Sequence, residues 1–72
     1  MNPLITFRES RGASRALLAR QLGVSYSSLA AVENGLTCNV PTRILAGIRK
    51  LGGDPQEIQR AYVAWRREPV AA

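Results

Sequence analysis

The stretch that decides the fold runs from residue 14 to residue 35 and reads SRALLARQLGVSYSSLAAVENG. Ser14 and Ser25 each precede an apolar run, and serine favours helix N-caps because its hydroxyl accepts a hydrogen bond from a free amide of the first turn. Gly23, between the runs, tolerates the positive φ with which many helices end, and an Asn-Gly pair closes the stretch in the same way. The pattern predicts two short helices joined by a tight turn, over residues 15–22 and 26–34.

The apolar residues of these two predicted helices recur at helical spacing. The first helix has an apolar face made of Leu17, Leu18, Ala19 and Leu22. The second carries Leu29 and Val32 one turn apart. Because Ala19 is small and Gly23 lies at the reversal, the second helix can cross the first closely, as in a helix-turn-helix.

Three more helices are expected around this pair. Asn2 and Pro3 offer an N-cap followed by proline at the first helical position, which starts a helix over residues 3–11. Pro41 starts the next one, whose buried stripe is Ile44, Leu45, Ile48 and Leu51. Asp54 caps the last helix, which ends before Pro69 and whose stripe is Ile58, Ala61, Tyr62 and Trp65. 

No segment alternates apolar and polar residues over the length of a strand, and no internal repeat is visible. We therefore expect an all-α fold, a compact five-helix bundle that contains a helix-turn-helix. The length fits a single domain over residues 1–68, followed by a frayed tail at residues 69–72.

Composition narrows the classes of function. Cys38 is the only cysteine and histidine is absent, so neither an intramolecular disulfide nor the usual Cys/His metal sites can form. Because histidine is the most common general base near neutral pH, we expect no enzymatic activity, and no cofactor. The apolar runs are far shorter than the ~20 residues of a membrane span, and residues 1–4 do not begin a secretory signal. A cytoplasmic protein is the expectation.

The charge of the chain points to a nucleic acid. Its formal net charge is +5, from nine arginines and one lysine against five carboxylates. The planar guanidinium suits phosphate oxygens and guanine edges better than an ammonium does. A solvated basic face would also explain the charge. The spacing of the motifs therefore has to distinguish a nucleic-acid-binding protein from a basic protein without such a partner.

Residues Gly12 to Gly35 resemble, without gaps, the core of the Cro and phage-repressor family of helix-turn-helix proteins, and the resemblance extends less regularly to Leu51. Its most specific elements are the pair Ala19 and Gly23, the run Leu22-Gly23-Val24-Ser25, and the closing Glu33-Asn34-Gly35. The resemblance implies a lambda-repressor-like bundle in which the third helix lies in the major groove of DNA and the second crosses the backbone.

The same resemblance implies a set of DNA-contacting residues. Base reading would fall to the start of the third helix and its neighbours: Tyr26, Ser27, Ser28, Ala31 and Arg15. Arg15 stands where the family usually carries a glutamine, and its guanidinium suits either a phosphate or a guanine. The DNA backbone would be contacted by Ser14, Arg15, Thr37, Asn39, Thr42 and Arg43. For the loop residues among these, a solvated connector is the competing interpretation.

Two further sets have other roles. By the resemblance, Arg8 and Glu33 form a buried ion pair, and together with Ala19 and Gly23 they make up the structural part of the motif. The last helix has two interpretations: its stripe either completes the core, which suits Ile58 and Tyr62, or projects outward. A dimer or partner interface would then involve Tyr62, Trp65 and Arg66.

The function expected is that of a sequence-specific regulator of transcription, a repressor that binds double-stranded DNA as a homodimer on a palindromic or near-palindromic site. The alternative is an antitoxin or a restriction-system controller protein, which would use the same DNA-binding domain and bind a protein partner through the last helix. A helical bundle without a nucleic-acid role, and an enzyme, are the remaining hypotheses.

Overall fold

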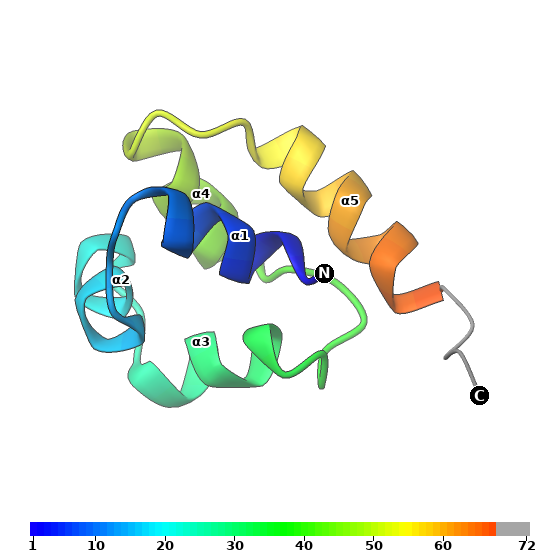
Figure 1. Cartoon of the computed structure of the whole chain (residues 1–72), viewed down its shortest axis with the longest axis horizontal. Coiled ribbons are helices and arrows are strands. Elements are labelled where there is room, and N and C mark those ends of the chain that lie inside the picture. Colours follow the sequence, from blue (N-terminus) through cyan, green and yellow to red (C-terminus); the bar gives the residue numbers. More distant parts are fainter. Residues whose placement is uncertain (68–72) are drawn as a thin grey trace.

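The computed structural model describes residues 1–67, within which the chain forms five helices and no strand (Figure 1). They are α1 (Pro3–Ser10), α2 (Arg15–Leu22), α3 (Tyr26–Glu33), α4 (Thr42–Lys50) and α5 (Pro55–Arg67). The expected all-α fold class is confirmed. None of these five helices is both long and apolar enough to cross a membrane. The predicted helix stop at Pro69 and the tail at residues 69–72 lie outside the described residues.

The helices begin at the caps that the sequence indicated. A side-chain oxygen accepts a hydrogen bond from a first-turn backbone amide at four helix starts, those capped by Asn2, Ser14, Ser25 and Asp54. Helices α1 and α3 each end one residue earlier than predicted, because Arg11 and Asn34 occupy the C-cap positions. Pro41 precedes α4 as its N-cap and is not its first residue.

One hydrophobic core lies between the five helices. Helix α2 packs against α3 and α4, α5 packs against α1 and α4, and α1 also packs against α3. Figure 1 shows α3 along one edge of the molecule, with α1 between it and α5. Every helix contributes large, fully buried side chains: Leu4, Leu18, Leu29, Val32, Ile44, Ile48 and Tyr62. The burial of Leu29 and Val32 fixes α3 with its opposite face turned outward.

The expected core face of α2 is partly wrong. Leu18, Ala19 and Leu22 are buried as predicted, but Leu17 is 44% exposed. Neighbouring positions on a helix are separated by about 100° around its axis, so Leu17 cannot share the face on which Leu18 and Leu22 lie four residues apart. Because residues 16–19 are all apolar, the sequence alone did not show which of the two adjacent leucines faces the core.

Helix α4 supports α2 at close range. A Cβ atom on Gly47 would lie 3.0 Å from the Cα atom of Leu22, so the two backbones approach more closely than any larger residue at position 47 allows. The buried Ile44 and Ile48 lie on either side of this contact along α4. The contact with α4 therefore fixes the orientation of α2 and of the α3 helix that packs against it.

Candidate nucleic-acid interface

The turn at residues 23–25 sets α3 against α2. Gly23 has a φ of +73°, and the amide of the next residue, Val24, donates to the carbonyl of Ala19 at 3.0 Å and so closes α2. The Oγ atom of Ser25 then accepts a hydrogen bond from the amide of Ser28 at 3.1 Å and begins α3. The left-handed residue and the cap thus occupy the positions that the sequence predicted.

The first turn of α3 presents exposed polar side chains. Tyr26 is 54% exposed, and Ser27 and Ser28 are exposed beside it. Ser28 Oγ accepts a hydrogen bond from Ser25 Oγ at 2.8 Å, whereas no described residue bonds to the hydroxyl of Ser27. Ala31, one turn further on, is half-buried and offers only a methyl group. Tyr26, Ser27 and Ser28 therefore have the exposure that base reading requires. The hydroxyl of Ser27 is free of hydrogen bonds to the described residues.

Arg15, the first residue of α2, is held between α2 and α3. Its Nε atom donates to Oε1 of Glu33 at 3.1 Å, and its guanidinium carbon lies 5.8 Å from the centre of the Tyr26 ring. The hydrogen bond to Glu33 is the main cause that raises the pKa of Arg15 above its ordinary value, against the lowering effect of burial. The guanidinium therefore stays charged. Neither contact was predicted from the sequence.

The carboxylate of Glu33 joins three helices. Its side chain is fully buried, and it also accepts a hydrogen bond from Nε of Arg8 in α1, with 3.1 Å between Nε and Oε2. The ion pair between Arg8 and Glu33 that the resemblance implied is present, and the pair with Arg15 is additional. The side-chain amide of Asn2 donates to the carbonyls of Val32 and Glu33, at 2.9 and 3.0 Å. The C-terminal end of α3 is thereby fixed to both α1 and α2.

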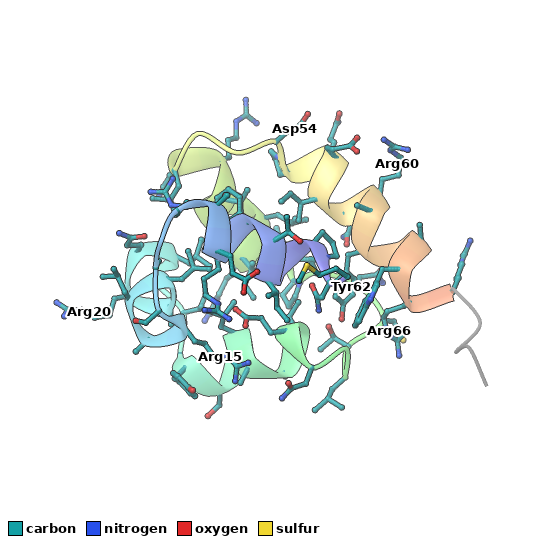
Figure 2. The ribbon with its side chains drawn as sticks, viewed as in Figure 1. Arg15, Arg20, Asp54, Arg60, Tyr62 and Arg66 are labelled. Atoms are coloured by element: carbon teal, nitrogen blue, oxygen red, sulfur yellow. The ribbon has the colours of Figure 1, made fainter. Side chains whose placement is uncertain are left out.

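Two arginines flank α3. Arg15 contacts both its first residue, Tyr26, and its last, Glu33, and Nε of Arg66 donates to the carbonyl of Gly35, just beyond its end, at 3.0 Å. Figure 2 shows both arginines on the α3 side of the molecule, with Asp54 and Arg60 on the opposite side. The exposed first turn of α3 thus lies beside positive charge, and Asp54 is remote from it.

The residues expected to contact the DNA backbone differ in what they offer. Four of them have exposed side chains: Ser14, Asn39, Thr42 and Arg43. Thr37 does not fit the expectation for its hydroxyl, because Oγ1 donates to the carbonyl of Asn39 at 2.9 Å and lies 3.1 Å from the hydroxyl of Tyr62. The hydroxyl proton of Thr37 is thus already donated within the protein. Of the donors of Thr37, only the backbone amide has no partner among the described residues.

The outer end of α5 is engaged within the chain. The expectation that Tyr62 belongs to a dimer or partner surface is wrong, because its side chain is fully buried and its hydroxyl donates to the carbonyl of Thr37 at 2.8 Å. Trp65 is half-buried, and its ring lies against Gly35, where a Cβ atom would come within 2.8 Å of it. Arg66 is exposed but binds the same glycine.

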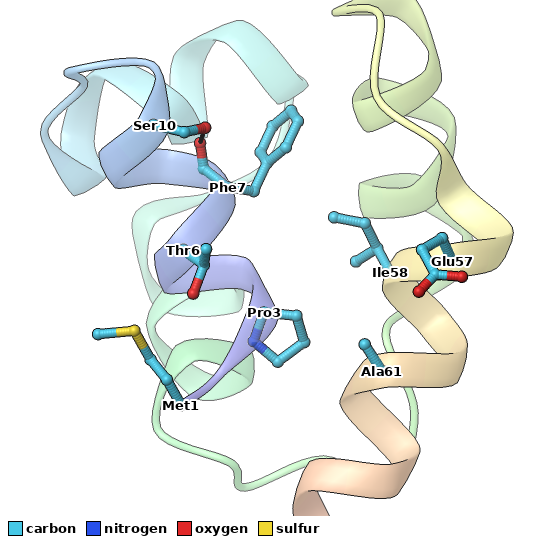
Figure 3. A pocket seen from close by; sticks show the side chains of 8 residues that line it. All are labelled: Met1, Pro3, Thr6, Phe7, Ser10, Glu57, Ile58 and Ala61. Carbon is cyan, nitrogen blue, oxygen red and sulfur yellow. Dashed lines mark hydrogen bonds between the residues drawn. The ribbon is translucent and has the colours of Figure 1, made fainter.

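A groove between α1 and α5 lies apart from these residues (Figure 3). It has a volume of about 290 Å³, and its apolar lining comes from Met1, Pro3, Phe7, Ile58 and Ala61. The hydroxyl of Ser10 at its edge donates to the carbonyl of Phe7 at 2.7 Å. Neither α2 nor α3 contributes to the groove, so it does not extend the candidate interface.

Gln59 is the residue that the sequence analysis missed most clearly. Its Oε1 atom accepts a hydrogen bond from the amide of Val40 at 2.8 Å, and its Nε2 atom donates to the carbonyl of Val40 at 3.3 Å. Residues 40 and 59 are far apart in the sequence, so no local pattern marks this pair. The only visible signal is an uncharged polar residue next to the apolar stripe of α5.

The candidate interface therefore consists of the exposed first turn of α3, Arg15 beside it, and the α3–α4 loop, defined as residues 34–41. All three are positioned by contacts within the chain: the Ser25 cap for the first turn, Glu33 for Arg15, and α5 for the loop. No model of a protein family, no curated protein and no solved structure matches this chain.

Proposed function

We propose that this chain is a sequence-specific DNA-binding regulator of transcription, a repressor, whose α2 and α3 act as a helix-turn-helix. The observation that carries the proposal is the exposed polar first turn of α3, with Tyr26, Ser27 and Ser28 next to the charged guanidinium of Arg15. An α-helix fits the major groove of B-DNA, and residues at its N-terminal end reach the base edges. Serine and tyrosine hydroxyls donate and accept hydrogen bonds there.

The distribution of charge supports duplex DNA as the partner. Phosphates dominate the affinity of proteins for DNA, and positively charged side chains on either side of a recognition helix can meet the two backbones that border the groove. Arg15, which contacts Tyr26 and Glu33 of α3, and Arg66, which binds Gly35 just beyond α3, supply two such charges. Arg43 and Thr42, exposed at the start of α4, add two more donors next to the α3–α4 loop.

The proposal includes a homodimer on DNA. Helix α3 has eight residues, so a single copy reaches only a short run of base pairs. Two copies related by a two-fold axis would place two α3 helices about one turn of B-DNA, roughly 34 Å, apart on a palindromic or near-palindromic site. Occupation of a promoter would then exclude polymerase. Such a regulator works in the compartment that holds the DNA, which the proposal takes to be the cytoplasm.

The packing of α5 favours this function over an antitoxin or a controller protein that captures a partner through the last helix. Tyr62 is fully buried, and Trp65 and Arg66 both contact Gly35 at the end of the recognition region. A partner could reach only the part of the half-buried Trp65 ring that does not face the glycine. In the described part of α5, these three side chains therefore support the proposed DNA-binding surface from within the chain.

Selection of bound sequences from random duplex DNA, followed by a salt titration on the selected duplex, tests the proposal. We expect an enriched palindromic or near-palindromic motif bound by two chains, and a logarithm of affinity that falls with the logarithm of salt by about 0.9 per neutralised phosphate. Absence of any enriched motif would overturn specific reading. An affinity that does not change with salt would overturn phosphate binding, and one chain per site would overturn the dimer.

A further inference from the structure

The α3–α4 loop is held in place by side chains of α5. Gln59 binds both backbone groups of one loop residue, because its carboxamide accepts from the amide of Val40 at 2.8 Å and donates to its carbonyl at 3.3 Å. One turn further along α5, the hydroxyl of Tyr62 donates to the carbonyl of Thr37 at 2.8 Å. The loop therefore runs alongside α5, antiparallel to it.

The third turn of α5 continues the same series of contacts. The ring of Trp65 packs on Gly35, and Nε of Arg66 donates to the carbonyl of Gly35 at 3.0 Å. These two residues, with Gln59 and Tyr62, contact the loop at one end, the middle and the other end. We call the four side chains the α5 clamp: Gln59, Tyr62, Trp65 and Arg66.

The hydrogen bonds of the loop leave one run of donors without a partner. Four loop carbonyls, those of residues 35, 37, 39 and 40, accept hydrogen bonds from side chains of the protein. The amides of Thr37, Cys38 and Asn39 donate to no group among the described residues, and the carbonyls of residues 34, 36 and 38 accept from none of them. The three free amides are consecutive, whereas the three free carbonyls alternate with bonded ones, so only the donors form an unbroken run.

A phosphate oxygen is the acceptor that matches three consecutive amides. Successive backbone N–H groups bind anions, and backbone amides are regular donors to DNA phosphates. Exposed Asn39 and Arg43 lie beside these amides in the sequence and add a neutral and a charged donor. Rigidity matters here, because a loop that is ordered before binding does not lose its conformational freedom on the DNA.

We infer that the α5 clamp pre-organises the amides of residues 37–39 as a site for one DNA backbone phosphate, and that Gln59 and Tyr62 are positioning residues that act through the loop without touching DNA. The inference rests on the proposed function and adds to it a role for α5. It also explains why tyrosine, and not phenylalanine, stands at this buried position: the ring fills the core, and the hydroxyl holds Thr37 in place.

Two substitutions each remove the hydrogen bonds of one clamp residue while preserving the packing of α5. Tyr62→Phe keeps the buried ring and deletes the hydroxyl. Gln59→Leu keeps a side chain of similar size and deletes both hydrogen bonds to Val40. Gln56→Leu is the matched control, because Gln56 is an exposed residue of the same helix whose side chain makes no hydrogen bond to the described residues. Thermal unfolding of each variant establishes that it is folded at the temperature of the assays.

The first measurement uses the free protein, so it does not depend on DNA. Nitrogen-15 relaxation of the loop amides should give order parameters near 0.85 in the unsubstituted chain and in Gln56→Leu, and values below about 0.6 in the two clamp variants. If the loop stays rigid in both Tyr62→Phe and Gln59→Leu, the clamp is wrong whatever the chain binds.

The second measurement is affinity for the duplex selected with the unsubstituted chain, over a range of salt. We expect both clamp variants to bind about tenfold more weakly, the size of one charge-assisted hydrogen bond, with the preferred sequence unchanged and the salt slope also unchanged, because a neutral amide releases no counterion. Duplexes in which one phosphate at a time is replaced by a neutral methylphosphonate locate the contact: the replacement at the contacted phosphate should weaken binding of the unsubstituted chain and leave binding of the clamp variants unchanged. Partial unfolding alone would lower the active fraction and leave the loss at that position as it was. A mobile loop with the loss at that position unchanged would overturn the phosphate site while leaving the proposed function intact. An unsubstituted chain that binds no DNA would overturn both.

Discussion

The Nε atom of Arg15 lies 3.1 Å from Oε1 of Glu33, a carboxylate with no exposed side-chain surface. The structural ion pair of the bundle and the arginine of the candidate interface are therefore parts of one network. Because the hydrogen bond uses Nε, the two terminal amino groups of the guanidinium are left for another acceptor. The Tyr26 ring on its other side restricts where the guanidinium can point.

Substitution of Glu33 should destabilise the whole bundle. Glu33→Ala leaves Arg8 and Arg15 without their carboxylate, and their side chains are only 20% and 27% exposed. We expect a loss of roughly 3 kcal/mol in the free energy of unfolding, at the lower end for a broken buried ion pair because both arginines keep some contact with water. Urea denaturation followed by circular dichroism measures the change.

The control for this substitution is Glu57→Ala, which removes the exposed carboxylate paired with Arg60 on α5. Surface ion pairs contribute little, so this variant should unfold at the same urea concentration as the unsubstituted chain. Equal midpoints for Glu33→Ala and Glu57→Ala would show that the network around Glu33 does not stabilise the fold.

Arg15→Ala should weaken binding to all duplexes to a similar extent. An arginine that binds a phosphate contributes to affinity but not to sequence preference, so we expect a loss of about tenfold and a salt slope shallower by about 0.9. Arg15→Lys should not restore the affinity, because the compact ammonium lacks the planar fork with which the guanidinium binds Glu33 through Nε and presents its terminal amino groups to a phosphate. Arg60→Ala, on the opposite side of the molecule, should leave the affinity unchanged. An equal loss in both alanine variants would mean that only net charge matters.

Substitutions at Tyr26 separate its two contacts. Tyr26→Ala removes the hydroxyl and also the ring that lies against Arg15, so both sequence preference and overall affinity should change. Tyr26→Phe keeps the ring, and its salt slope should match that of the unsubstituted chain. If the hydroxyl reads a base, Tyr26→Phe should reduce discrimination at one base pair by about 1–3 kcal/mol. Repeating the selection from random DNA with each variant measures this, and an unchanged motif in both would remove Tyr26 from the reading surface.

Local patterns in the sequence were sufficient to predict the helices. Caps such as Ser14 and Ser25 act on amides within the next turn, and Gly23 acts on its own backbone, so their effects depend on near neighbours alone. The periodicity of apolar residues located the core in the same way, apart from Leu17, where four consecutive apolar residues made the face ambiguous.

The contacts that prepare the candidate interface could not be predicted, because they join segments distant in sequence. The amide of Asn2 reaches the end of α3, Arg15 shares Glu33 with Arg8, and Gln59 binds Val40. Each is a polar contact with geometry set by the packing of helices, and no spacing rule anticipates it. The resemblance supplied one such pair, Arg8 with Glu33, and missed the rest.

The contact between Trp65 and Gly35 predicts a difference between two glycines with the same backbone conformation. Gly23 and Gly35 both have a φ of +73°, but a Cβ atom on Gly23 meets nothing within 4 Å, whereas one on Gly35 would come within 2.8 Å of the Trp65 ring. Gly23→Ala should therefore cost only the left-handed strain, about 1–2 kcal/mol, and Gly35→Ala should cost distinctly more. Trp65→Leu should remove that excess, so that in its background both substitutions destabilise equally, as measured by urea unfolding in a double-mutant cycle. An excess that persists without the tryptophan would place its origin elsewhere in the turn.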